Sequence, residues 1–414
     1  MKIKLTYFLC LLTMLNFSVF SQDIITETQK LLAGDGSAGD YFGQSVSITG
    51  NTAIVGSWQD NDNGDLSGSA YIFEKINGTW TQIAKLLPSD GAAGDLFGCR
   101  VSISGDTAIV GAYANDENGT DSGSAYIFEK INGTWTNNET QKLLASDGST
   151  DDLFSYSVSI SGNVAIVGAY QNDNSGRTNT GAAYIFEKIE GIWTQTNKLL
   201  ADDYFGYDYF GCSVSISGDT AIIGAYGNDD NGAHSGSAYI FKKIGETWTQ
   251  TAKLLASDGA ANDYFGDSVS ISGDIAIIGA YLDDNNGTDS GSAYIFEKLN
   301  ENWAETTNLT ASDVSAFDFF GKSVSISGDT VIIGAWEDDD NGDSSGSVYT
   351  FEKTDGIWTQ KAKLLASDGS ASDYFGVSVS ISGDIAIIGA YYELGSAYVF
   401  DLNPSLTINN WMLY

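Results

Sequence analysis

The sequence predicts an all-β fold: a seven-bladed β-propeller of four-stranded antiparallel blades, closed by an N-terminal strand that completes the C-terminal blade. Three observations predict it. One phrase, Phe-Gly followed by Ser-Val-Ser-Ile-Ser-Gly-Asp, recurs with small changes every 55 to 57 residues. Each copy reads as four short strands, and no helical period of useful length occurs. A fixed period of this size is typical of a propeller, a solenoid or an array. The phenylalanine of the phrase is Phe42, Phe97, Phe154, Phe210, Phe265, Phe320 and Phe375.

The second copy shows how the four strands are recognised. Residues 101–104 alternate between apolar and polar, and a two-residue Gly-Asp turn leads to a second strand over 107–113. A polar loop separates this strand from a third over 124–130. Asn132-Gly133 is a strong hairpin signal, because both positions favour positive φ. Trp135 then lies at the start of a fourth strand that ends near Ala145.

The two ends of the array predict how the ring closes. The long loop before each Phe-Gly does not look like a hairpin, so we place the crossing between blades there. Residues 26–33 then form a fourth strand without a blade, and the last copy stops after its third strand, 396–402. The N-terminal strand is expected to complete the last blade, which removes the open edges of the array. The propeller spans 22–402.

The N-terminus looks like a targeting segment. Lys2 and Lys4 precede an apolar stretch over 5–20, and small residues before Gln22 suit signal peptidase. We expect residues 1–21 to be a signal peptide and the protein to be secreted, extracellular or held at the cell surface. The alternative is a membrane anchor, for which the stretch is short. No transmembrane segment is expected in the mature chain, and 403–414 is expected to be a short tail.

The charge balance excludes several partners. Lys and Arg total 19 against 54 Asp and Glu, a formal net charge of −35. Nucleic acid, anionic lipid and heparin-like chains would be repelled, whereas cations and basic proteins would be attracted. The single histidine, His234, argues against Ser-His-Asp catalysis and against histidine-based metal sites.

More than half of the acidic residues are expected on one rim of the ring. In an antiparallel blade, the loop before the first strand and the loop between the second and third strands lie at the same end. The first loop carries an aspartate pair in every copy. This pair would either concentrate cations on the rim or cap backbone amides. The pairs are Asp35/Asp40, Asp90/Asp95, Asp147/Asp152, Asp203/Asp208, Asp258/Asp263, Asp313/Asp318 and Asp368/Asp373.

Phe-Gly followed about 13 residues later by Gly-Ala-Tyr resembles the FG-GAP repeat of integrin α-chain propellers and of secreted bacterial proteins. The third copy departs from the motif, with Phe154-Ser155 before Gly168-Ala169, and Tyr or Trp stands where the family name has Pro. The resemblance spans about 23–402. It implies a seven-bladed propeller used in adhesion or recognition, often with calcium bound in hairpin loops.

The resemblance implies bound calcium, but the residues of this chain match the calcium loop of the family only in part. The family loop resembles Asp-x-Asp-x-Asp-Gly between the Phe-Gly and Gly-Ala strands, where this chain has only Gly-Asp or Gly-Asn. Acidic runs follow Gly-Ala-Tyr instead, and their first ligand position is usually not acidic. Calcium takes six to eight oxygens. These runs are either calcium loops or solvated Asx-rich turns. The candidate ligands are Asp60, Asp62, Asp229, Asp230, Asp283, Asp284, Asp338 and Asp340.

Two further residue types repeat. Six tryptophans start the fourth strands and are expected to pack there, with sugar stacking as the alternative: Trp80, Trp135, Trp193, Trp248, Trp303 and Trp358. Cys99 and Cys212 occupy equivalent positions two blades apart, too far for a disulfide, so two free thiols are expected.

These observations lead to two functional hypotheses, besides a third in which the protein is a secretion or surface-array component with no small ligand. The first is a non-catalytic, monomeric propeller for adhesion or recognition that binds an extracellular protein or glycan through the acidic rim, with calcium as a conceivable aid. The alternative is a carbohydrate-active lyase or hydrolase that uses a carboxylate pair on the same rim. Near-identical copies argue against a catalytic centre, which usually needs one blade to differ. Arg177 and the loop over 202–207 are the most divergent features.

Overall fold

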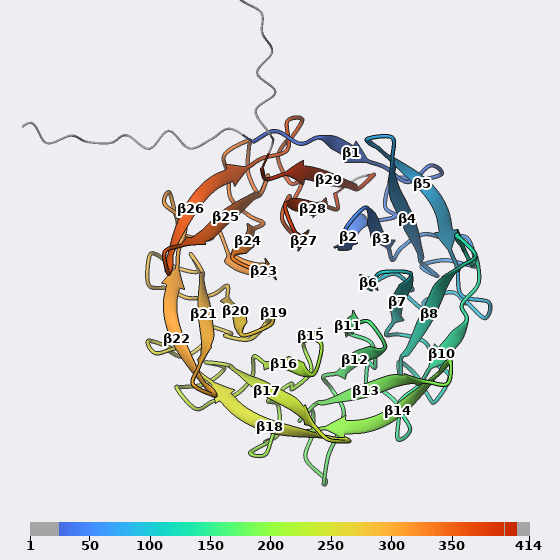
Figure 1. Cartoon of the computed structure of the whole chain (residues 1–414), viewed down its shortest axis with the longest axis horizontal. Helices are drawn as coiled ribbons and strands as arrows, with labels where there is room; N and C mark the ends of the chain where they lie inside the picture. The colour runs from blue at the N-terminus through green and yellow to red at the C-terminus, as the bar shows by residue number, and fades with distance from the viewer. Residues whose placement is uncertain (1–24, 393, 404–414) are drawn as a thin grey trace, which may run out of the picture.

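The computed structural model describes residues 25–392 and 394–403, which form a closed ring of seven β-sheets around a central channel (Figure 1). The expected signal peptide, and all of the expected tail except Asn403, lie outside these residues. Within the described ranges there is no helix that could cross a membrane. The prediction of an all-β seven-bladed propeller is confirmed.

Each blade has four positions, counted outward from the channel. The first position is taken by β2 (Phe42–Thr49), β6 (Arg100–Ser104), β11 (Ser157–Ser161), β15 (Val214–Ser217), β19 (Ser268–Ser272), β23 (Phe320–Ser327) and β27 (Ser378–Ser382). The second is taken by β3 (Thr52–Ser57), β7 (Thr107–Ala112), β12 (Val164–Ala169), β16 (Thr220–Ala225), β20 (Ile275–Ala280), β24 (Thr330–Ala335) and β28 (Ile385–Ala390).

The outer two positions follow the same order. The third is taken by β4 (Ser69–Ile76), β8 (Ser124–Ile131), β13 (Ala182–Ile189), β17 (Ser237–Ile244), β21 (Ser292–Leu299), β25 (Ser347–Thr354) and β29 (Ser396–Asp401). The outermost is taken by β5 (Thr79–Leu86), β9 (Thr134–Trp135) with β10 (Gln141–Leu143), β14 (Ile192–Leu199), β18 (Thr247–Leu254), β22 (Asn302–Leu309), β26 (Ile357–Leu364) and β1 (Gln29–Leu31). The fourth strand of the second blade is therefore split in two, where the sequence predicted one strand.

The ring closes as predicted. Strand β1 pairs antiparallel with β29, with Lys30 opposite Tyr398 and Leu31 opposite Ala397. Figure 1 shows β1 lying outside β29, so that the two ends of the described chain share one blade. The seventh sheet has the order β1-β29-β28-β27.

Apolar residues on both faces of the strands form cores between neighbouring blades. Each core contains the Phe of a Phe-Gly pair, which is 0% exposed in all seven copies. Phe97, for example, packs edge-on against Tyr126 and Phe128 with ring centroids 5.5 and 5.9 Å apart. Burial on both sides explains why the second and third strands are apolar at consecutive positions rather than alternating.

The glycines of the repeat allow blades to approach each other through their backbones. A Cβ atom on Gly56 would lie 1.9 Å from the carbonyl oxygen of Gly98 in the next blade. Gly98 itself has a φ of 88°. Only glycine combines this positive φ with so close a contact. The Phe-Gly and Gly-Ala pairs are thus the two halves of one contact between blades.

Candidate functional site

The two acid-bearing loops share one rim, as predicted; we call it the acidic rim. The loop that enters a blade lies against the loop between the second and third strands of the preceding blade. Between the first two blades, the Phe97 N–H donates to the Ser67 carbonyl at 3.0 Å, and the Leu96 N–H to the Leu66 carbonyl at 3.2 Å. Parallel bridges such as Gly68 to Phe97 and Gly181 to Phe210 repeat this contact around the ring.

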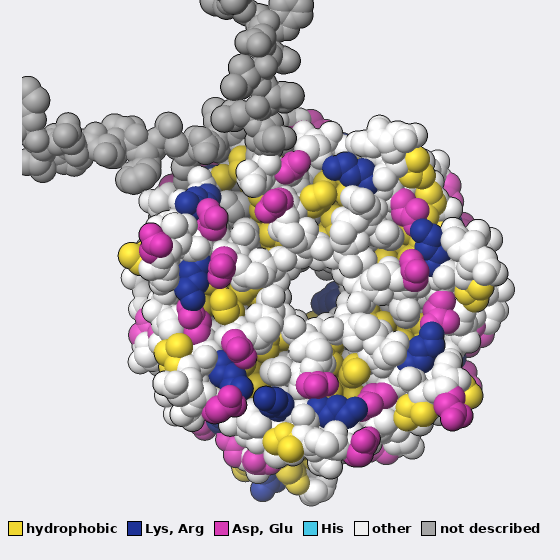
Figure 2. All heavy atoms as spheres, viewed as in Figure 1, with side chains coloured by type: hydrophobic (Ala, Val, Ile, Leu, Met, Phe, Trp, Pro, Cys, Tyr) yellow, Lys and Arg dark blue, Asp and Glu magenta, His cyan; other side chains and the backbone are white. Residues whose placement is uncertain are grey.

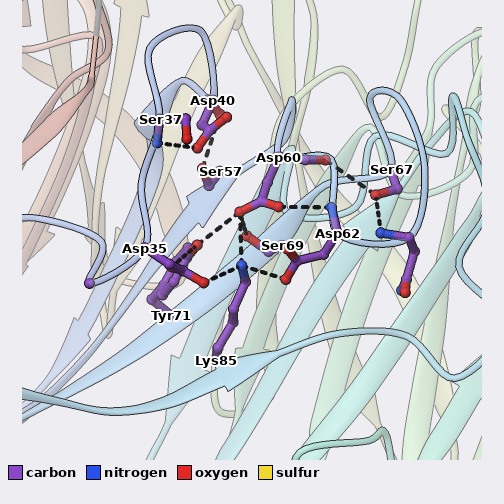
Figure 3. Close-up of polar contacts among 12 residues, drawn as sticks. Asp35, Ser37, Asp40, Ser57, Asp60, Asp62, Ser67, Ser69, Tyr71 and Lys85 are labelled. Atoms are coloured by element: carbon purple, nitrogen blue, oxygen red, sulfur yellow. Dashed lines mark hydrogen bonds and ion pairs between the residues drawn. The ribbon is translucent and has the colours of Figure 1, made fainter.

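The first aspartate of each pair lies beside a lysine ammonium in six blades. In the first blade, Lys85 reaches up from the outermost strand into a group of three carboxylates (Figure 3). Its Nζ lies 2.8 Å from Asp35, 3.0 Å from Asp60 and 2.5 Å from Asp62. The Tyr71 hydroxyl lies 2.9 Å from both Asp35 and Asp60. We call each such group a lysine cluster.

The other lysine clusters follow the same geometry. The distance from Nζ to the first aspartate of the pair is 2.6–2.9 Å in all of them. The pairs are Lys30–Asp368, Lys85–Asp35, Lys142–Asp90, Lys198–Asp147, Lys253–Asp203 and Lys363–Asp313. These six ammonium groups offset part of the negative charge of the acidic rim.

The second aspartate of each pair caps a turn, which confirms one of the two readings of these pairs. In the first blade, the Ser37 N–H donates to the Asp40 carboxylate at 2.6 Å. The equivalent acceptors in the other blades are Asp95, Asp152, Asp208, Asp263, Asp318 and Asp373, each bonded to the N–H three residues earlier at 2.6–2.9 Å. These carboxylates hold the loop between blades.

The eight predicted calcium ligands take three different places. Asp60, Asp283 and Asp338 are 1–4% exposed and accept hydrogen bonds from a serine and a tyrosine of the third strand. Asp62, Asp230 and Asp340 lie 2.5–2.6 Å from the lysine of their cluster. Asp229 and Asp284 accept the N–H five residues later, which closes the turn. Within 25–392 and 394–403, no group of three or more His, Cys, Asp or Glu side chains is placed to hold a metal ion.

The fifth blade differs from the others because Asn308 replaces the lysine. The Asn308 amide donates to Asp258 at 3.2 Å, and the Asn285 amide donates to Asp258 at 2.9 Å and to Asp283 at 3.1 Å. Burial raises the pKa of the Asp283 carboxyl, and the hydrogen bonds that it accepts offset only part of this effect. Two carboxylates thus share a cluster without an ammonium group.

Burial and hydrogen bonding shift the pKa values of the two aspartates of a pair in opposite directions. Burial alone would raise the pKa of Asp313, but hydrogen bonding and charge attraction from Lys363 outweigh it, so this pKa lies below its ordinary value. Asp318 is buried without a lysine partner, and its burial raises its pKa to about 6. The same effect raises the pKa of Asp208 and Asp263 to about 6.

Aromatic side chains form an almost complete ring on the channel side of the acidic rim, interrupted between Trp58 and Tyr113, where Leu96 precedes the Phe-Gly pair. They come from the position before five of the seven Phe-Gly or Phe-Ser pairs, from the position after the Gly-Ala or Gly-Ser pair that ends each second strand, and from Tyr156. Consecutive rings have centroids 4.2–6.5 Å apart, and every member is partly exposed. We call this ring the aromatic collar; its members are Tyr41, Trp58, Tyr113, Tyr156, Tyr170, Tyr209, Tyr226, Tyr264, Tyr281, Phe319, Trp336, Tyr374 and Tyr391.

The collar opens into a cavity of about 640 Å³ in the central channel. Five collar residues line it, together with Gln44, Gln59, Arg100, Asp267 and Lys322. Figure 2 shows the channel open at the centre of one face, with a basic side chain visible inside the opening and acidic and basic side chains close together around it. The cavity therefore offers aromatic faces and a small number of polar and charged groups.

An exposed aromatic loop extends the acidic rim outward at one blade. Phe205 is 64% exposed and Tyr207 is 53% exposed. The Arg177 guanidinium lies 4.9 Å from the Phe205 ring centroid and donates to the Tyr204 carbonyl at 2.6 Å. Tyr207 contacts Tyr209 of the collar at 6.2 Å. The divergent residues noted in the sequence therefore meet in one place.

The remaining candidates have structural roles. Five of the six repeated tryptophans are buried, at 3–7% exposure, and Trp303 is partly buried in the same type of core. This confirms packing rather than a sugar platform at these positions. Cys99 and Cys212 are free and buried, as predicted.

Sequence reasoning missed the aromatic collar and the lysine clusters. The signal for the collar was present, because Tyr, Trp or Phe stands before most Phe-Gly pairs and after the Gly-Ala or Gly-Ser pair that ends each second strand. The lysine clusters had a weaker signal, since five of the six lysines come about 50 residues after the aspartate that they contact, and Lys30 lies at the other end of the described chain from Asp368.

Comparisons with known proteins agree with this architecture. The family model for the FG-GAP repeat matches seven segments: 25–73, 80–128, 137–186, 193–241, 248–296, 303–351 and 358–400. No curated protein matches the chain significantly. Among solved structures, a chain of the "Crystal Structure of Mitotic Checkpoint Complex" aligns with a TM-score of 0.55 and 11% identity, over 97% of this chain and 99% of that chain. At this identity the likeness shows the fold alone. Since the family model covers well over half of the sequence, with one match in each of the seven copies, the protein belongs to the FG-GAP repeat family.

Proposed function

We propose that the protein is a non-catalytic, extracellular recognition propeller that binds a protein or glycan as a monomer through its acidic rim. The observation that carries this proposal is the aromatic surface of that rim. Most rim carboxylates are occupied by lysines or by backbone amides, whereas the collar, Phe205 and Tyr207 keep exposed faces. Exposed aromatic side chains are typical of binding surfaces.

The test compares two exposed apolar side chains on opposite rims. Phe205→Ser changes the acidic rim, and Ile357→Ser changes the outer-strand hairpin at the other rim; the two side chains are 64% and 65% exposed. We expect Phe205→Ser to weaken binding in a screen of glycans and purified extracellular proteins at least fivefold, and Ile357→Ser to leave it unchanged. Equal losses, or a loss with Ile357→Ser alone, would contradict binding through the acidic rim.

No observation favours the enzymatic alternative over recognition. In each pair the second aspartate caps a turn, and in six blades the first is paired with a lysine. The raised pKa of Asp208, Asp263 and Asp318 follows from burial beneath a loop. We expect no product when the protein is incubated with a polysaccharide panel. Release of reducing or unsaturated ends by the wild type, lost in Asp318→Asn, would establish the enzyme instead.

Calcium is proposed only for the fifth blade. The loops of Asp60, Asp230 and Asp338 already hold an ammonium group where a cation would lie. In the fifth blade, Asp258, Asp283, Asn285 and Asn308 supply two carboxylates and two amides, which hold at most six side-chain oxygens, and water would complete a larger shell.

Asn308→Lys tests this calcium proposal. The change gives the fifth blade the lysine that six other blades have. We expect millimolar calcium, and not magnesium, to raise the Tm of the wild type by a few degrees, and expect this rise to disappear in Asn308→Lys. Asn302→Lys, at the exposed start of the same strand, is the control and keeps the rise. No rise in the wild type would exclude calcium.

A further inference from the structure

The channel mouth differs chemically from the rest of the ring. The residue after each Phe-Gly or Phe-Ser pair is different in nearly every copy: Gln44, Cys99, Tyr156, Cys212, Asp267, Lys322 and Val377. The strands that follow repeat Ser-Val-Ser-Ile-Ser almost unchanged. Six of these seven residues, all but Cys99, line the cavity. The backbone repeats sevenfold, but the side chains that line this cavity do not. Such a lining suits one asymmetric ligand.

Two basic residues and one acidic residue line this cavity in an otherwise strongly acidic protein. Lys322 is neutralised in place, since its Nζ lies 2.9 Å from Asp267 and 3.9 Å from the Tyr281 ring centroid. Arg100 is different. Its guanidinium lies over Tyr156 at 5.1 Å and donates one hydrogen bond to the Cys99 carbonyl at 2.8 Å. Among the described residues, no carboxylate lies within salt-bridge distance of it.

Arg100 and the other groups that line the cavity determine which ligand fits. A guanidinium binds a carboxylate through two parallel hydrogen bonds, and stacking on Tyr156 leaves its edge available for this. Trp58, Trp336 and Tyr391 offer flat faces on which a ring can stack. The indole N–H groups of Trp58 and Trp336 are buried and have no acceptor among the described residues. Gln44 and Gln59 add hydrogen-bonding amides. The volume of about 640 Å³ lies within the range of small-ligand sites.

From these observations we infer that the channel mouth binds a sugar that carries a single carboxylate, such as a uronic acid at the end of a glycan, with the carboxylate on Arg100 and the sugar ring against the aromatic collar. The inference rests on the proposed recognition function and names the ligand class of one part of the same rim. A chain of many acidic sugars is disfavoured, because the net charge of −35 would repel it.

The two arginines of the chain give a matched experiment. The purified protein is titrated with glucuronic acid and with glucose, and binding is followed by tryptophan fluorescence and by saturation-transfer NMR. We expect glucuronic acid to bind at least tenfold more tightly than glucose. Arg100→Gln should remove this preference, Arg100→Lys should keep part of it, and Arg177→Gln should leave it unchanged. The Tm of each variant verifies that it is folded.

Three outcomes would overturn the inference: equal affinity for the two sugars, loss of the preference in Arg177→Gln, or no binding of either sugar. A peptide with a free C-terminal carboxylate that binds more tightly than glucuronic acid and depends on Arg100 would assign the cavity to protein ends instead. Failure here is separable from failure of the proposed function, because Phe205→Ser reports on the outer rim. Ligand binding that is lost in Phe205→Ser and retained in Arg100→Gln would support rim recognition and reject the sugar site.

Discussion

At the residue scale, the acidic rim combines two kinds of aspartate that respond oppositely to pH. Asp35, Asp90, Asp147, Asp203, Asp313 and Asp368 have a lowered pKa, because lysine and tyrosine hydrogen bonds outweigh the effect of burial. Their contribution to stability is present above the unfolded pKa and is lost as the pH falls below about 4. Asp208, Asp263 and Asp318 have a pKa of about 6. Their contribution to the stability of the fold is fully present below the pKa that an aspartate has in the unfolded chain. It is lost as the pH rises through 6. Together these shifts place maximum stability at mildly acidic pH.

Asp318→Asn tests this pH dependence. The amide oxygen can still accept the Ser315 N–H, but the side chain no longer carries a buried charge. We expect the variant to raise the Tm by about 1–3 °C at pH 7.5 and to raise it less at pH 5, where the wild-type carboxyl is mostly protonated. Asp355→Asn, in an exposed turn, removes the same charge and serves as the control. A lower Tm at pH 7.5 in Asp318→Asn would mean that the ionised carboxylate is needed to hold the loop.

At the element scale, the spacing between blades depends on glycine backbones. Gly224 of β16 faces the Gly266 carbonyl oxygen, and a Cβ at Gly224 would lie 1.9 Å from it. The third blade shows how a departure is tolerated. Ser155 replaces glycine at a φ of 77°, and its hydroxyl donates to the Ser124 carbonyl and accepts the Ala112 N–H. The blades shift apart there, since a Cβ on Gly111 would lie 2.7 Å from the Ser155 oxygen.

We therefore expect Gly224→Ala to lower the free energy of unfolding more than a replacement at a glycine that is needed only for its positive φ. We expect a loss of about 3 kcal/mol, because the added Cβ would collide with a backbone carbonyl group, which can move away only if the blades separate. Gly218→Ala is the comparison, since Gly218 has a φ of 57° and no atom within 4 Å of the added Cβ. Its expected cost is about 1 kcal/mol. The midpoints of urea unfolding measure the stability loss of both variants. Equal losses would show that the blades can separate at Gly224 with little loss of stability.

Elements were more predictable from the sequence than the site was. The strands, the hairpins and the ring closure follow from patterns within one copy and from counting copies. The lysine clusters depend on which residues of the outermost strand reach the rim, which strand order alone does not specify. Lys85 and Asp35 are 50 residues apart and meet because β5 runs back toward the rim. The aromatic collar could have been found from its repeated positions, but its contact with the channel required the geometry of the whole ring.

At the scale of the whole molecule, one short strand closes the ring. Leu31 of β1 is 1% exposed in the core between the last and the first blade. Lys30 forms the lysine cluster of the seventh blade, 2.7 Å from Asp368. Thr28 donates through its backbone to the Val399 carbonyl at 2.7 Å. This segment supplies the core, the charge pair and the edge hydrogen bonds that other blades obtain from their own outermost strand.

Removal of residues up to 33 should therefore open the ring between the seventh and the first blade. The exposed edge of β29 and the open core would then favour association between copies. We expect the truncated protein to lose at least 10 °C in Tm and to elute as dimers or larger species in size-exclusion chromatography. A synthetic peptide of residues 25–34 should restore the Tm and the monomer as its concentration rises, because binding to the native state stabilises it by mass action. The same peptide with Leu31→Ala is the control and should restore less, since it leaves the core unfilled. A truncated protein that stays monomeric with an unchanged Tm would show that the other contacts around the channel close the ring without β1.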